Sequence, residues 1–135
     1  MSYLLDANIL SDMIRRPHGV VATKVGEVGP LDVRTSIVVA AELRFGARKS
    51  GSLRLEKRLH ELFATVAVVP LTPPVDHVYA SIRTALERAG TPIGSYDLLI
   101  AAHALTLGDT MVTDNVREFA RVPGLTVENW LRSPV

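Results

Sequence analysis

Cysteine is absent from this chain, which excludes disulfides and thiolate metal sites. No apolar run reaches the roughly 18 residues that a membrane-spanning helix needs. The first residues also lack a basic stretch followed by a long apolar one, so we expect neither a membrane span nor a signal peptide. These absences fit a protein of the reducing cytosol, and a cytoplasmic location is our expectation.

The chain also lacks a strong charge of either sign. Its 15 basic and 14 acidic residues leave a formal net charge of +1. Tight nonspecific binding to nucleic acid requires many phosphate contacts, so composition neither indicates nor excludes an RNA substrate. What is present is a normal apolar content of 47% in 135 residues, which is enough for one domain over residues 1–135 with its own core.

Apolar patterns and turn residues predict an alternation of strands and helices. The expected strands are residues 3–5, 31–35, 66–71, 111–113 and 126–127, and the 66–71 run is expected to be covered on both faces. The expected helices are residues 8–14, 20–28, 37–49, 53–63, 73–89 and 96–107, with a helical turn at 116–120. This order predicts a three-layer α/β/α sandwich with a mainly parallel central sheet.

In such sheets the functional crevice lies beyond the carboxyl ends of the strands, which draws attention to four acids. Asp6 and Asp114 each follow an expected strand, and Asp97 lies in the first turn of an expected helix. Glu42 stands among apolar neighbours, where a buried, unpaired carboxylate would be costly. Each also has an ordinary explanation: a turn or helix cap for the aspartates, and the wet edge of an amphipathic helix for Glu42.

Four carboxylates in one crevice would repel one another unless a cation neutralised them. An all-oxygen ligand set without a cysteine or histidine run favours Mg²⁺, with Mn²⁺ as a possible substitute, over zinc. The natural substrate of such a site is a phosphodiester, because one or two metals about 4 Å apart activate water and stabilise the leaving oxygen.

Four segments in order resemble the motifs of PIN-domain proteins, and the chain's end resembles the VapC branch of bacterial toxins. The segments are LDANIL (5–10), AAELRFGA (40–47), IGSYDLLIAAHA (93–104), MVTDNVREF (111–119) and the ending at residues 122–130. The resemblance implies a PIN-like fold and an Mg²⁺-dependent endoribonuclease that acts as the toxin of a toxin–antitoxin pair. It also implies a VapB-like antitoxin and a homodimer.

The resemblance places Asp6, Glu42 and Asp97 on the family's catalytic, metal-binding acids. It places Asn8 on a polar residue that helps to shape the site. The family usually has Thr where this chain has Ala7, so one small polar contact is expected to be missing.

The fourth motif leaves the last acid open. Many PIN proteins have an aspartate two places after the threonine, and Asn115 occupies that place here. Asp114 is our first choice for the fourth catalytic and metal-binding carboxylate because it lies next to the strand end. Asn115 could instead hold a metal-bound water, and Glu118 is the third alternative. Thr113 and Asn115 are counted as supporting residues.

Other residues have weaker claims. Arg44 and Arg48 share a helix face and are possible RNA contacts, although an ordinary solvated face is the favoured explanation. His103 is interpreted as a packing or surface residue. Two further functions stay open: a noncatalytic binding module, favoured by Asn115, and a phosphohydrolase with Asp6 as nucleophile. The latter is disfavoured because Lys57, the lysine it would need, lies in mid-helix.

Overall fold

Five short parallel strands form the centre of the computed structural model, which describes residues 1–132. They are β1 (Tyr3–Leu5), β2 (Val33–Ser36), β3 (Ala67–Val69), β4 (Thr110–Val112) and β5 (Val127–Glu128), in the order β3-β2-β1-β4-β5. All four neighbouring pairs are parallel. The predicted sandwich is confirmed, and the last three residues of the predicted domain lie outside the described part.

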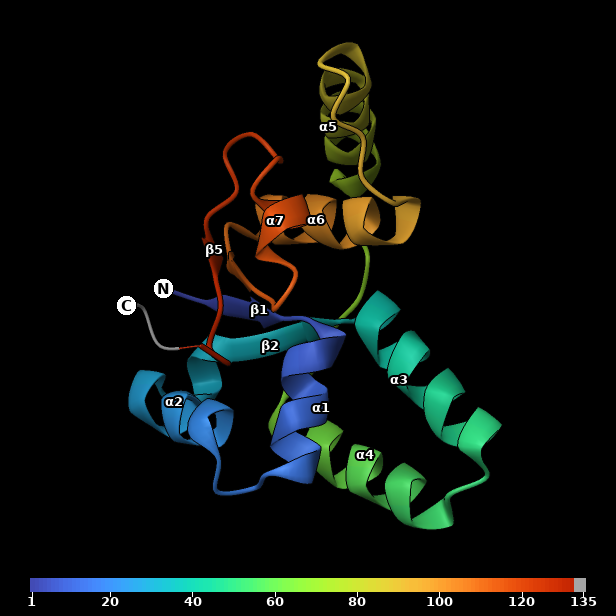
Figure 1. Ribbon diagram of the computed structural model, residues 1–135, viewed down its shortest axis with the longest axis vertical. Helices are drawn as coiled ribbons and strands as arrows, with labels where there is room; N and C mark the ends of the chain where they lie inside the picture. The colour runs from blue at the N-terminus through green and yellow to red at the C-terminus, as the bar shows by residue number, and fades with distance from the viewer. Residues whose placement is uncertain (133–135) are drawn as a thin grey trace.

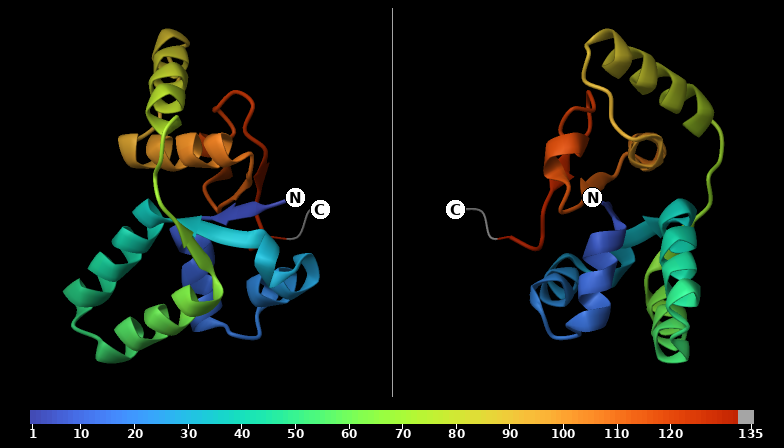
Figure 2. Two further views of the ribbon diagram at one scale, coloured as in Figure 1. Left: turned by 180° about the vertical axis from the view of Figure 1, so that it is seen from behind. Right: turned by 45° about the vertical axis from the view of Figure 1, so that its right-hand side comes forward.

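Helices cover both faces of the sheet, as Figure 1 shows. One layer consists of α1 (Ala7–Arg15), α2 (Val20–Val28), α3 (Ile37–Ser50) and α4 (Leu53–Thr65). The opposite layer consists of α5 (Val75–Arg88), α6 (Ser95–Leu107) and the single turn α7 (Val116–Phe119). The same division is visible from behind (Figure 2). Within residues 1–132, no helix is long and apolar enough to cross a membrane.

The strand order reverses at β1, and this reversal positions the site. The chain moves from β1 outward to β2 and β3, then crosses the opposite face to reach β4 on the other side of β1. The helices that follow β1 and β4 therefore leave toward opposite faces, which opens a crevice at the carboxyl ends of these two strands. Leu5 pairs with Val112 at that edge, so Asp6 and Thr113 emerge side by side.

The core explains why these elements form. Leu4 and Leu5 of β1 are fully buried, as expected for a central strand covered on both faces. Helix α6 is apolar around most of its circumference because it packs between the sheet and α5. Ser36 caps α3 by accepting a hydrogen bond from the Val38 amide at 3.1 Å, as the sequence predicted. Gly108 ends α6 with a φ of 72°, which favours glycine.

Two strands differ from expectation. Strand β2 begins at Val33, because Pro30–Asp32 form a single 3₁₀ turn that leaves Leu31 fully exposed. Strand β3 is only three residues long and lies at the edge of the sheet, with Ala67 exposed. The prediction of a longer strand covered on both faces was therefore wrong, since the apolar run does not distinguish a central strand from an edge strand.

Candidate active site

Asp6 is the most buried acid at the crevice, with 5% of its surface exposed. It ends β1 and is also the N-cap of α1: one carboxylate oxygen accepts a 2.8 Å hydrogen bond from the Ala7 amide. The other oxygen accepts a 2.7 Å bond from the Thr113 hydroxyl. Burial raises the pKa of Asp6, although both hydrogen bonds oppose that shift. Asp6 is thus both a helix cap and a fixed, strongly desolvated carboxylate.

A polar relay connects Asp6 to two further acids. The Thr113 hydroxyl donates to Asp6 and also accepts a 3.0 Å hydrogen bond from the backbone amide of Asn115. The Asn115 side chain donates to Asp97 at 3.1 Å and to Glu118 at 3.3 Å. Residues from the ends of β1 and β4, from α6 and from α7 therefore meet at one place.

These acids repel one another. The pKa of Asp97 is raised to about 6, first by desolvation, then by a hydrogen bond with Glu118, and then by the charges of Asp6 and Glu118. The hydrogen bond from Asn115 lowers the pKa of Asp97, but it offsets only part of this rise. Carboxylates that resist ionisation because of burial and mutual repulsion are stabilised when a cation binds between them.

Glu42 and Asn8 approach the same crevice in different ways. Glu42 is exposed on α3, as expected for a residue on the solvent-facing side of an amphipathic helix. Its charge nevertheless contributes to raising the pKa of Tyr96, as do the charges of Asp6 and Asp97. The Asn8 side-chain oxygen accepts a 3.1 Å hydrogen bond from the Asp114 amide, which ties α1 to the loop after β4.

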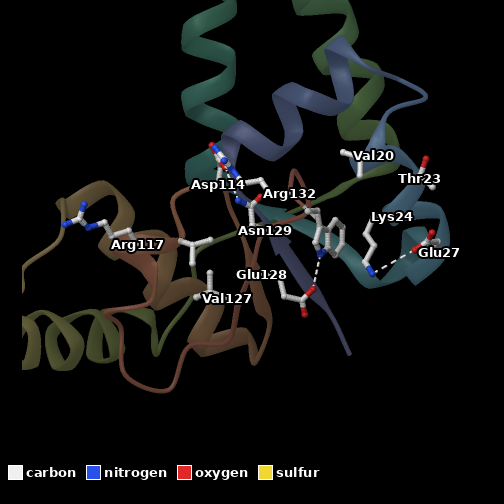
Figure 3. A pocket seen from close by; sticks show the side chains of 12 residues that line it. Val20, Thr23, Lys24, Glu27, Asp114, Arg117, Val127, Glu128, Asn129 and Arg132 are labelled. Carbon is white, nitrogen blue, oxygen red and sulfur yellow. Dashed lines mark hydrogen bonds and ion pairs between the residues drawn. The ribbon is translucent and has the colours of Figure 1, made fainter. Parts of the chain in front are cut away.

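The Asp114 side chain is bound elsewhere. Its carboxylate accepts a 2.9 Å hydrogen bond from the Asn129 side chain and a 3.3 Å hydrogen bond from the Arg132 guanidinium. Both bonds lower the pKa of Asp114. It lines a groove of about 840 Å³ that reaches to α2 and β5, and Figure 3 shows it beside Asn129 and Arg132. The structure therefore brings Glu118 to Asp97 and does not bring Asp114. The spacing of Glu118 three residues after Asn115, on one helical turn, is the sequence signal for this arrangement.

The two arginines considered as RNA contacts have partners within the fold. The Arg44 guanidinium lies 4.9 Å from the centre of the Phe63 ring, and Arg48 is 3.4 Å from Glu56. Both contacts join α3 to α4, so an RNA role for these arginines stays a prediction. His103 is a packing residue, 1% exposed, with its Nδ1 at 2.8 Å from the Ser36 hydroxyl.

The donor set fits a hard divalent cation. Within residues 1–132, no three Asp, Glu or His side chains lie close enough together to hold a metal ion by themselves. Mg²⁺ does not require such a group, because it typically binds one or two carboxylates and keeps several waters. Asp6 and Asp97 offer oxygen ligands only, both are partly or largely buried, and the charge of Asp6 contributes to raising the pKa of Asp97.

Known proteins resemble this chain over nearly its full length. A model of the PIN domain matches residues 3–125. Ribonuclease VapC2 of Rickettsia felis is 33% identical over 132 residues, covering 96% of this chain and 98% of that protein. The tRNA(fMet)-specific endonuclease VapC of Shigella flexneri is also 33% identical over 132 residues, with the same coverage.

Solved structures show the same likeness. The crystal structure of VapBC2 from Rickettsia felis bound to a DNA fragment from the promoter contains a chain with a TM-score of 0.89 and 32% identity. The match covers 96% of this chain and 99% of that one. The similarity therefore spans the whole crevice, from Asp6 to Glu118.

Proposed function

Because this chain belongs to the PIN domain family and, within it, to the VapC ribonucleases, we propose that it is a metal-dependent endoribonuclease. The observation that carries this proposal is the convergence of Asp6, Asp97 and Glu118 around Thr113 and Asn115. Carboxylates held together against their mutual repulsion form a binding site for a divalent cation. Such a cation is what metal-assisted hydrolysis of a phosphodiester requires.

A bound Mg²⁺ or Mn²⁺ would supply a reactive water at neutral pH and a counter-charge for the phosphate. Asp6 and Asp97 would bind the cation, and Glu42 would approach it from α3. The Ala7 amide and the Thr113 hydroxyl each hold one oxygen of Asp6, and the Asn115 side chain holds one oxygen of Asp97. The Asn115 side chain donates to both Asp97 and Glu118, and in this proposal Glu118 would accept a proton from the attacking water.

Relatives suggest the partners. The similar chain from Rickettsia felis belongs to a VapBC2 structure bound to a promoter DNA fragment, and we propose a VapB-like antitoxin for this chain as well. It would place a basic side chain into the acidic crevice. The Shigella flexneri relative is named as tRNA(fMet)-specific, so transfer RNA is the first substrate class that we propose to test. A homodimer is proposed from the family resemblance.

Purified, antitoxin-free protein is expected to cleave RNA with Mg²⁺ and to stop when a chelator is added. Below about pH 6, more Mg²⁺ is expected to be needed for half-maximal cleavage, because Asp97, with its pKa raised to about 6, must lose its proton to bind a cation. Gel analysis of a transfer RNA at several Mg²⁺ concentrations and pH values measures both effects. Cleavage that persists with chelator would contradict the metal-dependent mechanism.

A further inference from the structure

Helix α6 carries Asp97, yet much of its buried surface does little to set its orientation. Its buried residues include Ala101, Ala102 and Ala104, which are 0% exposed and present a smooth apolar surface to the neighbouring elements. Apolar contact is non-directional, so such a surface constrains rotation and sliding of the helix only weakly. Directional hydrogen bonds from α6 to other elements therefore decide where the Asp97 carboxylate lies.

Two side-chain hydrogen bonds join α6 to other elements within residues 1–132. At the crevice, Asp97 accepts from the Asn115 side chain at 3.1 Å. Six residues later, the Nδ1 atom of His103 lies 2.8 Å from the Ser36 hydroxyl, and both side chains are buried. Six residues correspond to about 9 Å along a helix and about 240° around it, so the two bonds leave α6 from different sides. Together they fix both the rotation and the axial position of the helix.

The proton in the bond between Ser36 and His103 belongs to Ser36. The Ser36 hydroxyl already accepts a 3.1 Å hydrogen bond from the Val38 amide, which can only donate. Within the described residues, His103 Nδ1 is the remaining partner of this fully buried hydroxyl, so Ser36 donates to Nδ1. The Nε2 atom of the ring is buried without a partner in the same part of the chain, so it does not decide between the two tautomers. Neutral His103 therefore carries its proton on Nε2.

The His103 ring is neutral at neutral pH. Burial lowers the pKa of the imidazole, and the charge of Arg34 adds to this effect. The backbone of Pro70 and the charge of Asp109 oppose the shift without reversing it. The neutral ring is the form that accepts from Ser36, because an imidazolium ring has only donors.

We propose that His103 is a positioning residue that accepts a hydrogen bond from Ser36 and thereby holds α6, with Asp97, at the place where the cation binds. Ser36 ends β2 and caps α3, so the bond anchors α6 to the sheet and to a helix of the layer on its other face. This inference rests on the proposed metal-dependent function, because it is cation binding that depends on the position of Asp97.

The test is a titration of the full chain with Mn²⁺ alone, followed by calorimetry, with melting temperatures measured in chelator. His103→Leu cannot accept from Ser36 and is expected to weaken Mn²⁺ binding roughly three- to tenfold. His103→Asn offers an oxygen close to the place of Nδ1 and is expected to restore most of the affinity. The matched control is Leu59→Ala, which removes core volume from α4 in the other layer. It is expected to lower the melting temperature and to bind Mn²⁺ as the wild type does.

A double variant and the ring nitrogens identify the partner. In a Ser36→Ala background, His103→Leu is expected to have little further effect on Mn²⁺ affinity, because the pair acts as a unit. Nitrogen NMR signals of the wild-type ring, which need no substitution, are expected to show an unprotonated Nδ1 at neutral pH. Wild-type affinity in His103→Leu, no recovery in His103→Asn, additive losses or a protonated Nδ1 would each overturn the inference. A wild-type chain that binds no Mn²⁺ would instead refute the metal-dependent function on which the inference rests.

Discussion

The substitution Asp6→Asn is expected to lower RNA cleavage by about three orders of magnitude while the fold persists. Charge stabilisation by a bound metal is worth several kcal/mol, and each 1.36 kcal/mol corresponds to about tenfold in rate. Asparagine keeps the shape of the side chain and an oxygen that accepts from the Ala7 amide, while the Thr113 hydroxyl turns to accept. Single-turnover cleavage with Mg²⁺ and a melting curve measure the two parts of this prediction.

Asp76 provides the matched control. It is an exposed aspartate in the first turn of α5, outside the crevice, and Asp76→Asn is expected to cleave at the wild-type rate. The metal-free Asp6→Asn variant is expected to melt no lower than the wild type, since burial makes the ionised Asp6 costly. If Asp6→Asn keeps most of its activity, the crevice is not the catalytic site.

The second large effect separates Glu118 from Asp114. Glu118→Gln is expected to lower cleavage about 100-fold, within the range for loss of a general acid or base. Asp114→Asn is expected to stay within about threefold of wild type, because its carboxylate is bound to Asn129 and Arg132. The stability of Asp114→Asn is expected to change little, since exposed ion pairs contribute at most about 1 kcal/mol.

Parallel cleavage assays of these two variants decide which acid completes the site. The reverse pattern, with Asp114→Asn inactive and Glu118→Gln active, would show that the loop after β4 rearranges in the working enzyme. Equal and small effects would show that Asp6, Glu42 and Asp97 suffice.

Much of the crevice was predictable from the sequence, because it follows from the fold class. An alternation of strands and helices predicts parallel strands, and parallel strands bring their carboxyl ends to one edge. Asp6 and Thr113, which follow two expected strands, meet at this edge in the structure. Asp97 was also predictable, since a helix that opens at the same edge presents its first turn to the crevice.

The direction of individual side chains was not predictable from spacing. Asp114 lies two residues after the end of β4, but its backbone amide faces Asn8 and its carboxylate faces Asn129. Asn115, one residue later, points back to Asp97. Neighbouring residues in a loop diverge in this way because each has its own tertiary partners, and these partners are distant in the sequence: Asn129 lies 15 residues from Asp114, and Asp97 lies 18 residues from Asn115. The same limit applies to β3, whose edge position depends on strand order.

The central claim is that Asp6 and Asp97 hold a divalent cation at the carboxyl ends of β1 and β4. The most direct measurement is residue-specific broadening of backbone amide NMR signals on titration with Mn²⁺, a paramagnetic substitute for Mg²⁺. The account predicts that broadening begins at Asp6, Asp97 and Asn115 and is lost in Asp6→Asn. Broadening centred on Asn129 and Arg132, or unaffected by Asp6→Asn, would contradict it.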